Sequence, residues 1–149
     1  GVRTFEAAAY LRRNGADVTR LRKIFRTDLA DFKSKADAIS STEVYLNYFA
    51  IAVCSGEDVD SPTVMGAQIA NDLLNVKDIK ASFVFSEFNN KIYISARSID
   101  EVNVQVIMER LGGGGHLSVA GSQLEGCTIE EAIVKLKDTL DAMVKDGEI

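Results

Sequence analysis

Four consecutive glycines followed by the single histidine of the chain, Gly112 to Gly115 and then His116, form the segment where we first look for chemistry. Each ordered glycine in a regular element costs roughly 0.5–1 kcal/mol relative to alanine. A helix C-cap explains Gly112. We expect that packing does not require Gly113, Gly114 and Gly115 to be glycine. Extra glycines instead suit a loop whose backbone N–H groups approach an oxyanion closely, without a Cβ in the way. The pattern therefore predicts a phosphate-binding loop, with a flexible hinge or a simple turn as alternatives.

Two side chains extend this prediction. His116 can donate a hydrogen bond to a phosphate or transfer a proton. Arg97 ends a predicted strand, just before the helix that leads into the glycines, and the paired donors of a guanidinium match phosphate oxygens. An exposed arginine at a strand end is the alternative. Ser98, Ser95 and Asn103 are polar neighbours that serve equally well as caps or turn formers. The segment is not a Walker A loop, because no Gly-Lys-Ser/Thr follows the glycines.

Other catalytic patterns are weak. Asp58 and Asp60 flank a predicted acidic turn, and Asp100 precedes a predicted helix, so neither position offers a convincing catalytic carboxylate pair. One histidine cannot build a His-rich metal site within this chain. Cys54 and Cys127 are far apart and match no zinc spacing. We expect reduced thiols, with a disulfide or a catalytic nucleophile as alternatives.

The composition favours an ordinary globular domain. The chain has 149 residues, of which 46% are hydrophobic and 26% charged, which suits one compact core. A net charge of −5 argues against a general nucleic-acid or anionic-membrane coat, but not against a small anion site. No apolar stretch approaches the roughly 20 residues that span a bilayer. The sequence starts at Gly1 without a methionine, so we expect a piece of a longer protein.

Periodicity places these residues in an α/β chain. Residues 1–40 carry three helix patterns rich in Arg and Lys, which we interpret as a helical connector with a solvated face. Strands are predicted at 43–46 and 48–54, the second buried on both faces. Pro62 opens a helix whose inner face we expect to be Val64, Ile69, Leu73 and Leu74.

The second half repeats this strand and helix pattern. Residues 79–88 and 91–98 are predicted as a hairpin through Asn89-Asn90. A helix at 102–111, the glycines and a short strand at 122–124 follow. A capping box of Thr128 and Glu131 starts the last helix, 129–145. The order predicts an α+β fold, a mixed sheet of about five strands flanked by helices.

These residues also resemble a known family. Ser95-Ala96-Arg97-Ser98, then Asn103 to Glu109, then Leu111 to His116 are similar to the signature of the DHHA1 domain in DHH-superfamily phosphoesterases. The opening Arg3 to Ala8, with Tyr10 to Arg12, resembles the stretch that follows the catalytic DHH domain in those proteins. The resemblance covers nearly the whole chain, and within the family it is nearest to the GdpP/YybT-type, membrane-anchored bacterial cyclic-di-AMP phosphodiesterases.

The resemblance implies a division of labour. In this family the DHH domain holds two Mn²⁺ ions through Asp and His, and the DHHA1 domain clasps the substrate. The residues that would then contact the phosphate or nucleotide are Arg97, Ser98, Gly112, Gly113, Gly114, Gly115 and His116. No Asp-His-His motif occurs here, so the metal ligands carry over to no residue of this chain.

The same resemblance yields expectations about organisation. Residues 1–40 would be a connector from the missing DHH domain, and 41–149 a DHHA1-type substrate-binding domain, inactive alone. Expected partners are a cyclic dinucleotide or short oligonucleotide and the DHH domain of the same parent, with a homodimer left open. We expect a cytoplasmic location and a membrane-anchored parent. The alternatives are an oligoribonuclease (nanoRNase) or 3′,5′-bisphosphate nucleotidase of the superfamily, or a non-catalytic nucleotide-binding regulatory domain.

Overall fold

The structure, a computed structural model, describes residues 1–55, 61–99 and 101–149. Asp58 and Asp60 of the predicted acidic turn, and Asp100, lie outside the described residues. The described elements run in chain order as α1 (Val2–Arg13), α2 (Val18–Ile24), α3 (Leu29–Ser40), β1 (Glu43–Tyr45), β2 (Phe49–Cys54), α4 (Pro62–Leu73), β3 (Ala81–Phe88), β4 (Lys91–Ser98), α5 (Val104–Arg110), β5 (Gly114–Gly115), β6 (Val119–Glu125) and α6 (Ile129–Lys145).

The strands form one mixed sheet in the order β1-β2-β3-β4-β6-β5. β2 and β3 are parallel and the other neighbouring pairs are antiparallel. The parallel pair follows from α4, which crosses over between β2 and β3 as parallel neighbours require. The predicted fold class is confirmed. The structure has one strand more than the expected five. This strand is the two-residue β5, which lies where the sequence predicts a loop.

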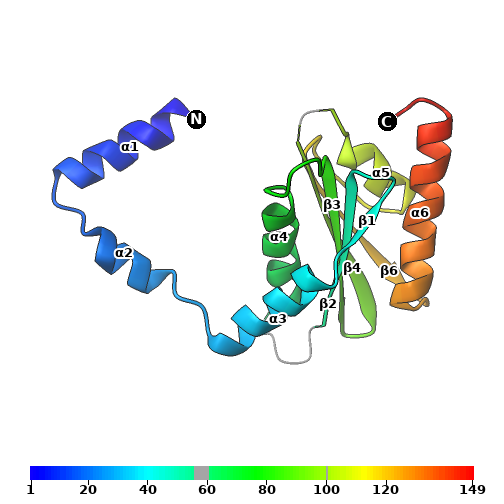
Figure 1. The fold of residues 1–149 in the computed structure, drawn as a ribbon, viewed down its shortest axis with the longest axis horizontal. Helices are drawn as coiled ribbons and strands as arrows, with labels where there is room; N and C mark the ends of the chain where they lie inside the picture. Colours follow the sequence, from blue (N-terminus) through cyan, green and yellow to red (C-terminus); the bar gives the residue numbers. More distant parts are fainter. Residues whose placement is uncertain (56–60, 100) are drawn as a thin grey trace.

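Helices cover both faces of the sheet (Figure 1), with α3 and α4 on one face and α5 and α6 on the other. β2 is buried along nearly its whole length, as predicted. The expected inner face of α4 is wrong at Val64, which is 55% exposed. The buried stripe of α4 runs instead through Met65, Ile69 and Leu73, at helical spacing.

Two local predictions are confirmed. Asn89 and Asn90 both have positive φ, 51° and 61°, as a tight β3–β4 hairpin requires. At the start of α6, the Thr128 hydroxyl accepts a hydrogen bond from the Glu131 N–H at 3.1 Å, and the Glu131 carboxylate accepts one from the Thr128 N–H at 3.4 Å. The Asn89-Asn90 turn sets the start of β4, the strand that carries Arg97, and the capping box sets the start of α6.

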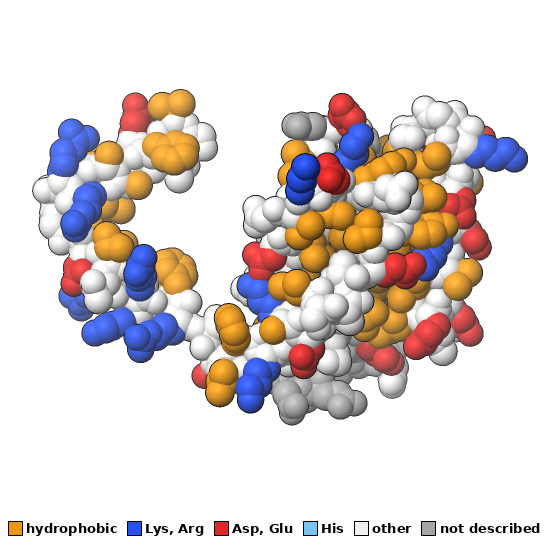
Figure 2. All heavy atoms as spheres, in the orientation of Figure 1, with side chains coloured by type: hydrophobic (Ala, Val, Ile, Leu, Met, Phe, Trp, Pro, Cys, Tyr) orange, Lys and Arg blue, Asp and Glu red, His pale blue; other side chains and the backbone are white. Residues whose placement is uncertain are grey.

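The first two helices stand apart from the sheet. α1 and α2 contain no buried residue, and Figure 1 shows them extending away from the other elements. Figure 2 shows Lys and Arg side chains gathered along this arm, with hydrophobic side chains between them. α3 differs, because it packs on α4 and β2 and buries Ala38. Among the described helices, none is long and apolar enough to cross a bilayer.

Candidate functional site

The first two glycines terminate helix α5. Gly112 has a φ of 78°, and its N–H donates to the Glu109 carbonyl at 3.1 Å. The Gly113 N–H donates to the Met108 carbonyl at 2.8 Å. This pair of bonds is a Schellman motif, which satisfies the last carbonyls of a helix. The predicted C-cap at Gly112 is confirmed, and the N–H groups of both glycines are already engaged.

Close packing on β6 accounts for two of the four glycines. A Cβ on Gly113 would lie 2.7 Å from the Ser122 Cα, and a Cβ on Gly115 would lie 2.5 Å from the Ala120 Cα. Our expectation that packing does not explain these glycines is therefore wrong at Gly113 and Gly115, because β5 and β6 approach too closely for a side chain. A Cβ on Gly114 would meet no described atom within 4 Å.

The hairpin between β5 and β6 leaves one glycine N–H directed outward. The His116 N–H donates to the Val119 carbonyl at 2.8 Å, and the Val119 N–H donates back at 3.3 Å. Hydrogen-bonded and non-hydrogen-bonded pairs alternate along an antiparallel ladder. The next pair, Gly115 with Ala120, is therefore of the non-hydrogen-bonded kind. Since β5 is an edge strand, the Gly115 N–H points away from β6 toward the open edge.

The register brings Arg97 and His116 to one face of the sheet. Arg97 lies opposite Val119, which in turn lies opposite His116. Residues directly opposed in a ladder point to the same face. Strands are about 4.8 Å apart, so the Cα atoms of Arg97 and His116 are separated by roughly 10 Å, with Val119 between them. Two candidates that are distant in sequence thus flank one position on the sheet.

A row of small residues, two of them glycines, lies beside this pair. Ser95 lies opposite Gly121, and Gly121 lies opposite Gly114. Helix α4 rises beside the row, since a Cβ on Gly66 would lie 3.5 Å from the Ser95 hydroxyl. We call the resulting hollow of about 370 Å³ the glycine-floored groove; its lining residues are Thr63, Tyr93, Ile94, Ser95, Gly112, Gly113, Gly121, Ser122 and Gln123.

Backbone carbonyls hold the Arg97 guanidinium beside the groove. Its Nη1 donates to the Ala96 carbonyl at 2.8 Å and lies 3.5 Å from the Ala120 carbonyl. Partial burial lowers the pKa of Arg97, because burial disfavours the charged form. Among the ion pairs between described residues, none includes Arg97. A guanidinium has five N–H donors, so most remain for an anion.

Two polar neighbours of Arg97 in the sequence, Ser98 and Asn103, do not line the groove. The buried Ser98 hydroxyl donates to the Leu117 carbonyl at 3.3 Å, on the face opposite to Arg97. The Asn103 side chain caps α5, accepting from the N–H groups of Gln105 and Val106. The Ser98 hydrogen bond ties the β5–β6 turn to β4, whereas the Asn103 side chain caps its own helix.

Sequence reasoning missed Tyr93 and Gln123, which line the groove. Strand alternation places Tyr93 on the same face as Arg97, four residues away, so the pattern could have found it. Gln123 carried no such signal, because its position depends on the pairing of β6 with β4.

Metal and thiol chemistry find little support in the described part of the chain. No three His, Cys, Asp or Glu side chains gather there as a metal site requires. Cys54 and Cys127 form no disulfide. Burial, with a smaller contribution from the Asp31 charge, raises the pKa of the Cys54 thiol, which disfavours the nucleophilic thiolate.

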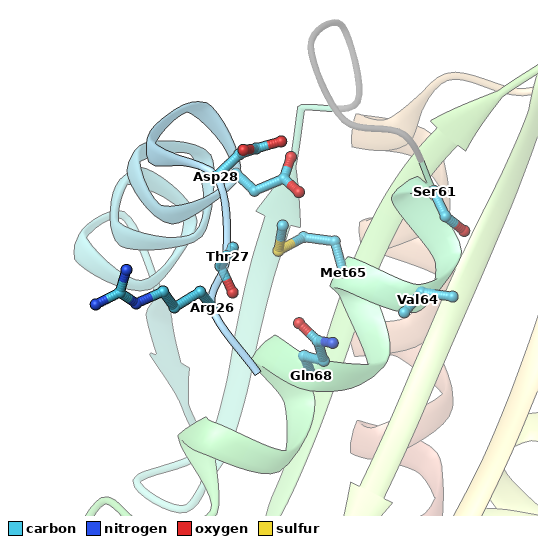
Figure 3. A pocket seen from close by; sticks show the side chains of 8 residues that line it. Arg26, Thr27, Asp28, Ser61, Val64, Met65 and Gln68 are labelled. Atoms are coloured by element: carbon cyan, nitrogen blue, oxygen red, sulfur yellow. The ribbon is translucent and has the colours of Figure 1, made fainter. Parts of the chain in front are cut away.

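A second hollow lies on the other side of α4, where α3 begins (Figure 3). It measures about 330 Å³ and is lined by Arg26, Thr27, Asp28, Asp31, Ser61, Val64, Met65 and Gln68. It shares no residue with the glycine-floored groove. Its two carboxylates, Asp28 and Asp31, outnumber its one cation, Arg26, and oppose anion binding, so we place the candidate site in the groove.

The chain is similar to known proteins along nearly its whole length. It is 44% identical over 146 residues to the cyclic-di-AMP phosphodiesterase PdeA of Listeria monocytogenes, covering 97% of this chain and 22% of that protein. It is 40% identical over 149 residues to the cyclic-di-AMP phosphodiesterase GdpP of Bacillus subtilis, covering 99% of this chain and 23% of that protein. The chain thus spans less than a quarter of the length of these relatives.

A solved structure shares the fold. An exopolyphosphatase-related protein from Bacteroides fragilis superposes with a TM-score of 0.80 at 22% identity, covering 96% of this chain and 44% of that one. The model of the DHHA1 domain family matches residues 47–146, which include every lining residue of the glycine-floored groove. This chain therefore belongs to the DHHA1 domain family.

Proposed function

We propose that this chain is the substrate-binding part of a manganese-dependent phosphodiesterase that hydrolyses a cyclic dinucleotide, cyclic di-AMP. The observation that carries the proposal is the placement of Arg97 and His116 on one face, beside the row of small residues Ser95, Gly121 and Gly114. The relatives named as cyclic-di-AMP phosphodiesterases support the choice of substrate.

The proposed contacts follow from the geometry of the groove. The Arg97 guanidinium and the His116 ring donate to phosphate oxygens from the same face of the sheet. Charge-assisted hydrogen bonds of this kind are roughly twice as strong as neutral ones. Gly114 and Gly121 let the phosphate approach the backbone. Gly112 and Gly113 act indirectly, by joining the β5–β6 hairpin to α5, and Ser98 does so by tying the β5–β6 turn to β4.

The metal-bearing half of the site belongs, in this proposal, to another domain. The residues described here do not suit a metal pair, so we assign the two Mn²⁺ ions to a DHH domain of the same parent chain. Residues 1–40 connect to that domain, 41–149 bind the substrate, and the parent is anchored to the bacterial membrane with this part in the cytoplasm. On its own the chain binds the nucleotide without hydrolysing it.

A titration of the ¹⁵N-labelled chain with cyclic di-AMP tests the binding site. We expect amide shifts at Gly114, Gly115 and His116. Gly114→Ala should keep the fold and weaken binding about tenfold or more, because the new methyl group would stand next to Gly121 of the groove while meeting no described atom within 4 Å. Shifts confined to other regions, or an unchanged affinity in Gly114→Ala, would remove the groove as the binding site.

A charge-matched pair of variants provides the control. Arg97→Gln should weaken binding about tenfold or more, since it removes a charged donor at the groove. Arg110→Gln removes the same charge from α5, where it pairs with Glu148, and should leave affinity within about twofold. Equal losses in both variants would indicate general charge attraction.

The parent enzyme tests the division of labour. His116→Ala and Arg97→Ala should lower turnover while Mn²⁺ binding stays intact. Profiling the parent with cyclic di-AMP, short oligoribonucleotides and a 3′,5′-bisphosphate nucleotide separates the proposed reaction from those of other superfamily members. A preference for either of the last two substrates would overturn the choice of cyclic dinucleotide.

A further inference from the structure

The glycine-floored groove continues past the position proposed for the phosphate. Tyr93 and Gln123 lie opposite each other in the register, on the face that carries Ser95 and Arg97. Both side chains line the groove, and Thr63 of α4 lines it as well. Four strand residues span about 13 Å, so Tyr93 lies roughly that far from Arg97, measured between Cα atoms. The groove therefore has an aromatic, amide-bearing end, and Arg97 lies just beyond its other end, two residues past Ser95 on the same face of β4.

We infer that Tyr93 and Gln123 form a subsite for the adenine base of the bound nucleotide. This inference rests on the proposed function, because it assumes that the phosphate lies beside Arg97. The half-buried Tyr93 ring offers a surface on which a planar base stacks. At about 370 Å³ the groove falls within the size range of small-ligand sites and has room for one base.

The Gln123 amide supplies base specificity. Its oxygen accepts from the adenine N6 amino group while its nitrogen donates to N7. Guanine presents two acceptors, O6 and N7, at the same edge, so the amide oxygen would face an acceptor. In the structure, the Gln123 Nε2 makes a long hydrogen bond of 3.4 Å to the exposed carboxylate of Glu125. A weak contact of this kind leaves the amide available to a ligand.

Helix α4 approaches β4 closely beside the groove. α4 presents the small residues Thr63 and Gly66 toward β4, and Gly66 lies next to the Ser95 hydroxyl. A larger side chain at Gly66 would press on Ser95, since its Cβ already lies at 3.5 Å from that hydroxyl. The close packing of α4 on β4 beside the groove therefore depends on the small residue Gly66.

Two substitutions separate the base from the phosphate. Tyr93→Leu keeps apolar volume and removes the ring, and should weaken binding of cyclic di-AMP, the adenine dinucleotide of the proposed function, about tenfold, as loss of one stacked base does. The same variant should bind ribose 5-phosphate, which has no base, as the wild type does. Tyr10→Leu removes an exposed ring from α1 and should change neither affinity. Circular dichroism checks that the variants are folded.

A specificity swap tests Gln123. Arginine pairs with O6 and N7 of guanine, so Gln123→Arg should shift the ratio of adenine to guanine dinucleotide affinity about tenfold toward guanine. Gln105→Arg adds the same charge on α5 and should leave the ratio unchanged. Comparing the ratio of the two affinities cancels any general increase in affinity that an added positive charge causes.

The outcomes distinguish this inference from the proposed function. If the wild type binds ribose 5-phosphate and the dinucleotide, but Tyr93→Leu and Gln123→Arg change nothing, the base subsite is wrong and the phosphate site stands. If the wild type binds neither ligand, the proposed function fails and this inference fails with it. If Tyr93→Leu instead lowers the thermal stability of the parent and leaves both affinities unchanged, Tyr93 belongs to a contact between domains. The proposed base subsite is then wrong.

Discussion

Alanine substitutions at three neighbouring glycines should have sharply different effects on stability. Gly113, Gly114 and Gly115 lie in sequence beside one another, yet the structure gives each a different environment. A Cβ at Gly113 or Gly115 would overlap the β6 backbone, whereas a Cβ at Gly114 would meet no described atom within 4 Å. A flexible loop would instead tolerate all three changes equally.

The magnitudes follow from the overlaps. Forcing atoms into a packed region costs about 1–3 kcal/mol, and we expect Gly113→Ala to fall in this range. Gly115→Ala should lose about 1–2 kcal/mol more, because Gly115 has a φ of 149°, which L residues rarely adopt. Gly114→Ala should change the free energy of unfolding by about 0.5 kcal/mol or less, as substitutions without clashes usually do.

Urea denaturation followed by circular dichroism measures these differences. The urea midpoint should fall for Gly113→Ala and Gly115→Ala with an unchanged slope, which indicates lower stability without a change in compactness. The melting temperature should fall by roughly 2–4 °C per kcal/mol for a protein of this size. Equal stabilities for Gly113→Ala and Gly114→Ala would refute the close approach of β5 to β6.

Three further predictions concern other parts of the fold. Thr128→Ala removes the α6 cap and should lower the free energy of unfolding by about 1 kcal/mol, measured by urea denaturation; no loss would contradict the capping box. In the native protein, iodoacetamide should modify Cys127 well before the buried Cys54, and equal rates by mass spectrometry would contradict the burial of Cys54. A hydrogen bond to Asp141 raises the pKa of Tyr45 from 10.0 to about 12, so its stabilising effect holds below pH 10 and is lost as the pH rises through about 12. An ultraviolet titration should show this late step, and it should disappear in Tyr45→Phe; a titration without it would refute the hydrogen bond.

Local signals predicted most elements because their causes are local. The Asn89-Asn90 turn depends on residues that tolerate positive φ, and the Thr128 cap depends on a hydroxyl three residues before its partner. The exposure of Val64 was mispredicted, since the helix period alone does not choose which side of α4 meets the sheet. That choice depends on how α4 crosses from β2 to β3.

The sequence by itself determined the residue types of the site and their family. Four glycines before His116, with Arg97 at a strand end, were visible as candidate phosphate ligands, and the resemblance to the DHHA1 domain rested on the same residues. The C-cap at Gly112 also followed from sequence, because a helix end needs a residue that adopts positive φ.

Only the tertiary structure decided what each glycine does. Close packing on β6 requires Gly113 and Gly115, and a short strand forms where a free loop was expected. The pairing of β6 with both β4 and β5 sets Arg97 beside His116 and adds Tyr93 and Gln123 to the groove. Strand pairing joins segments distant in the chain, and a shift of one residue reverses every side chain, so no local pattern reveals it.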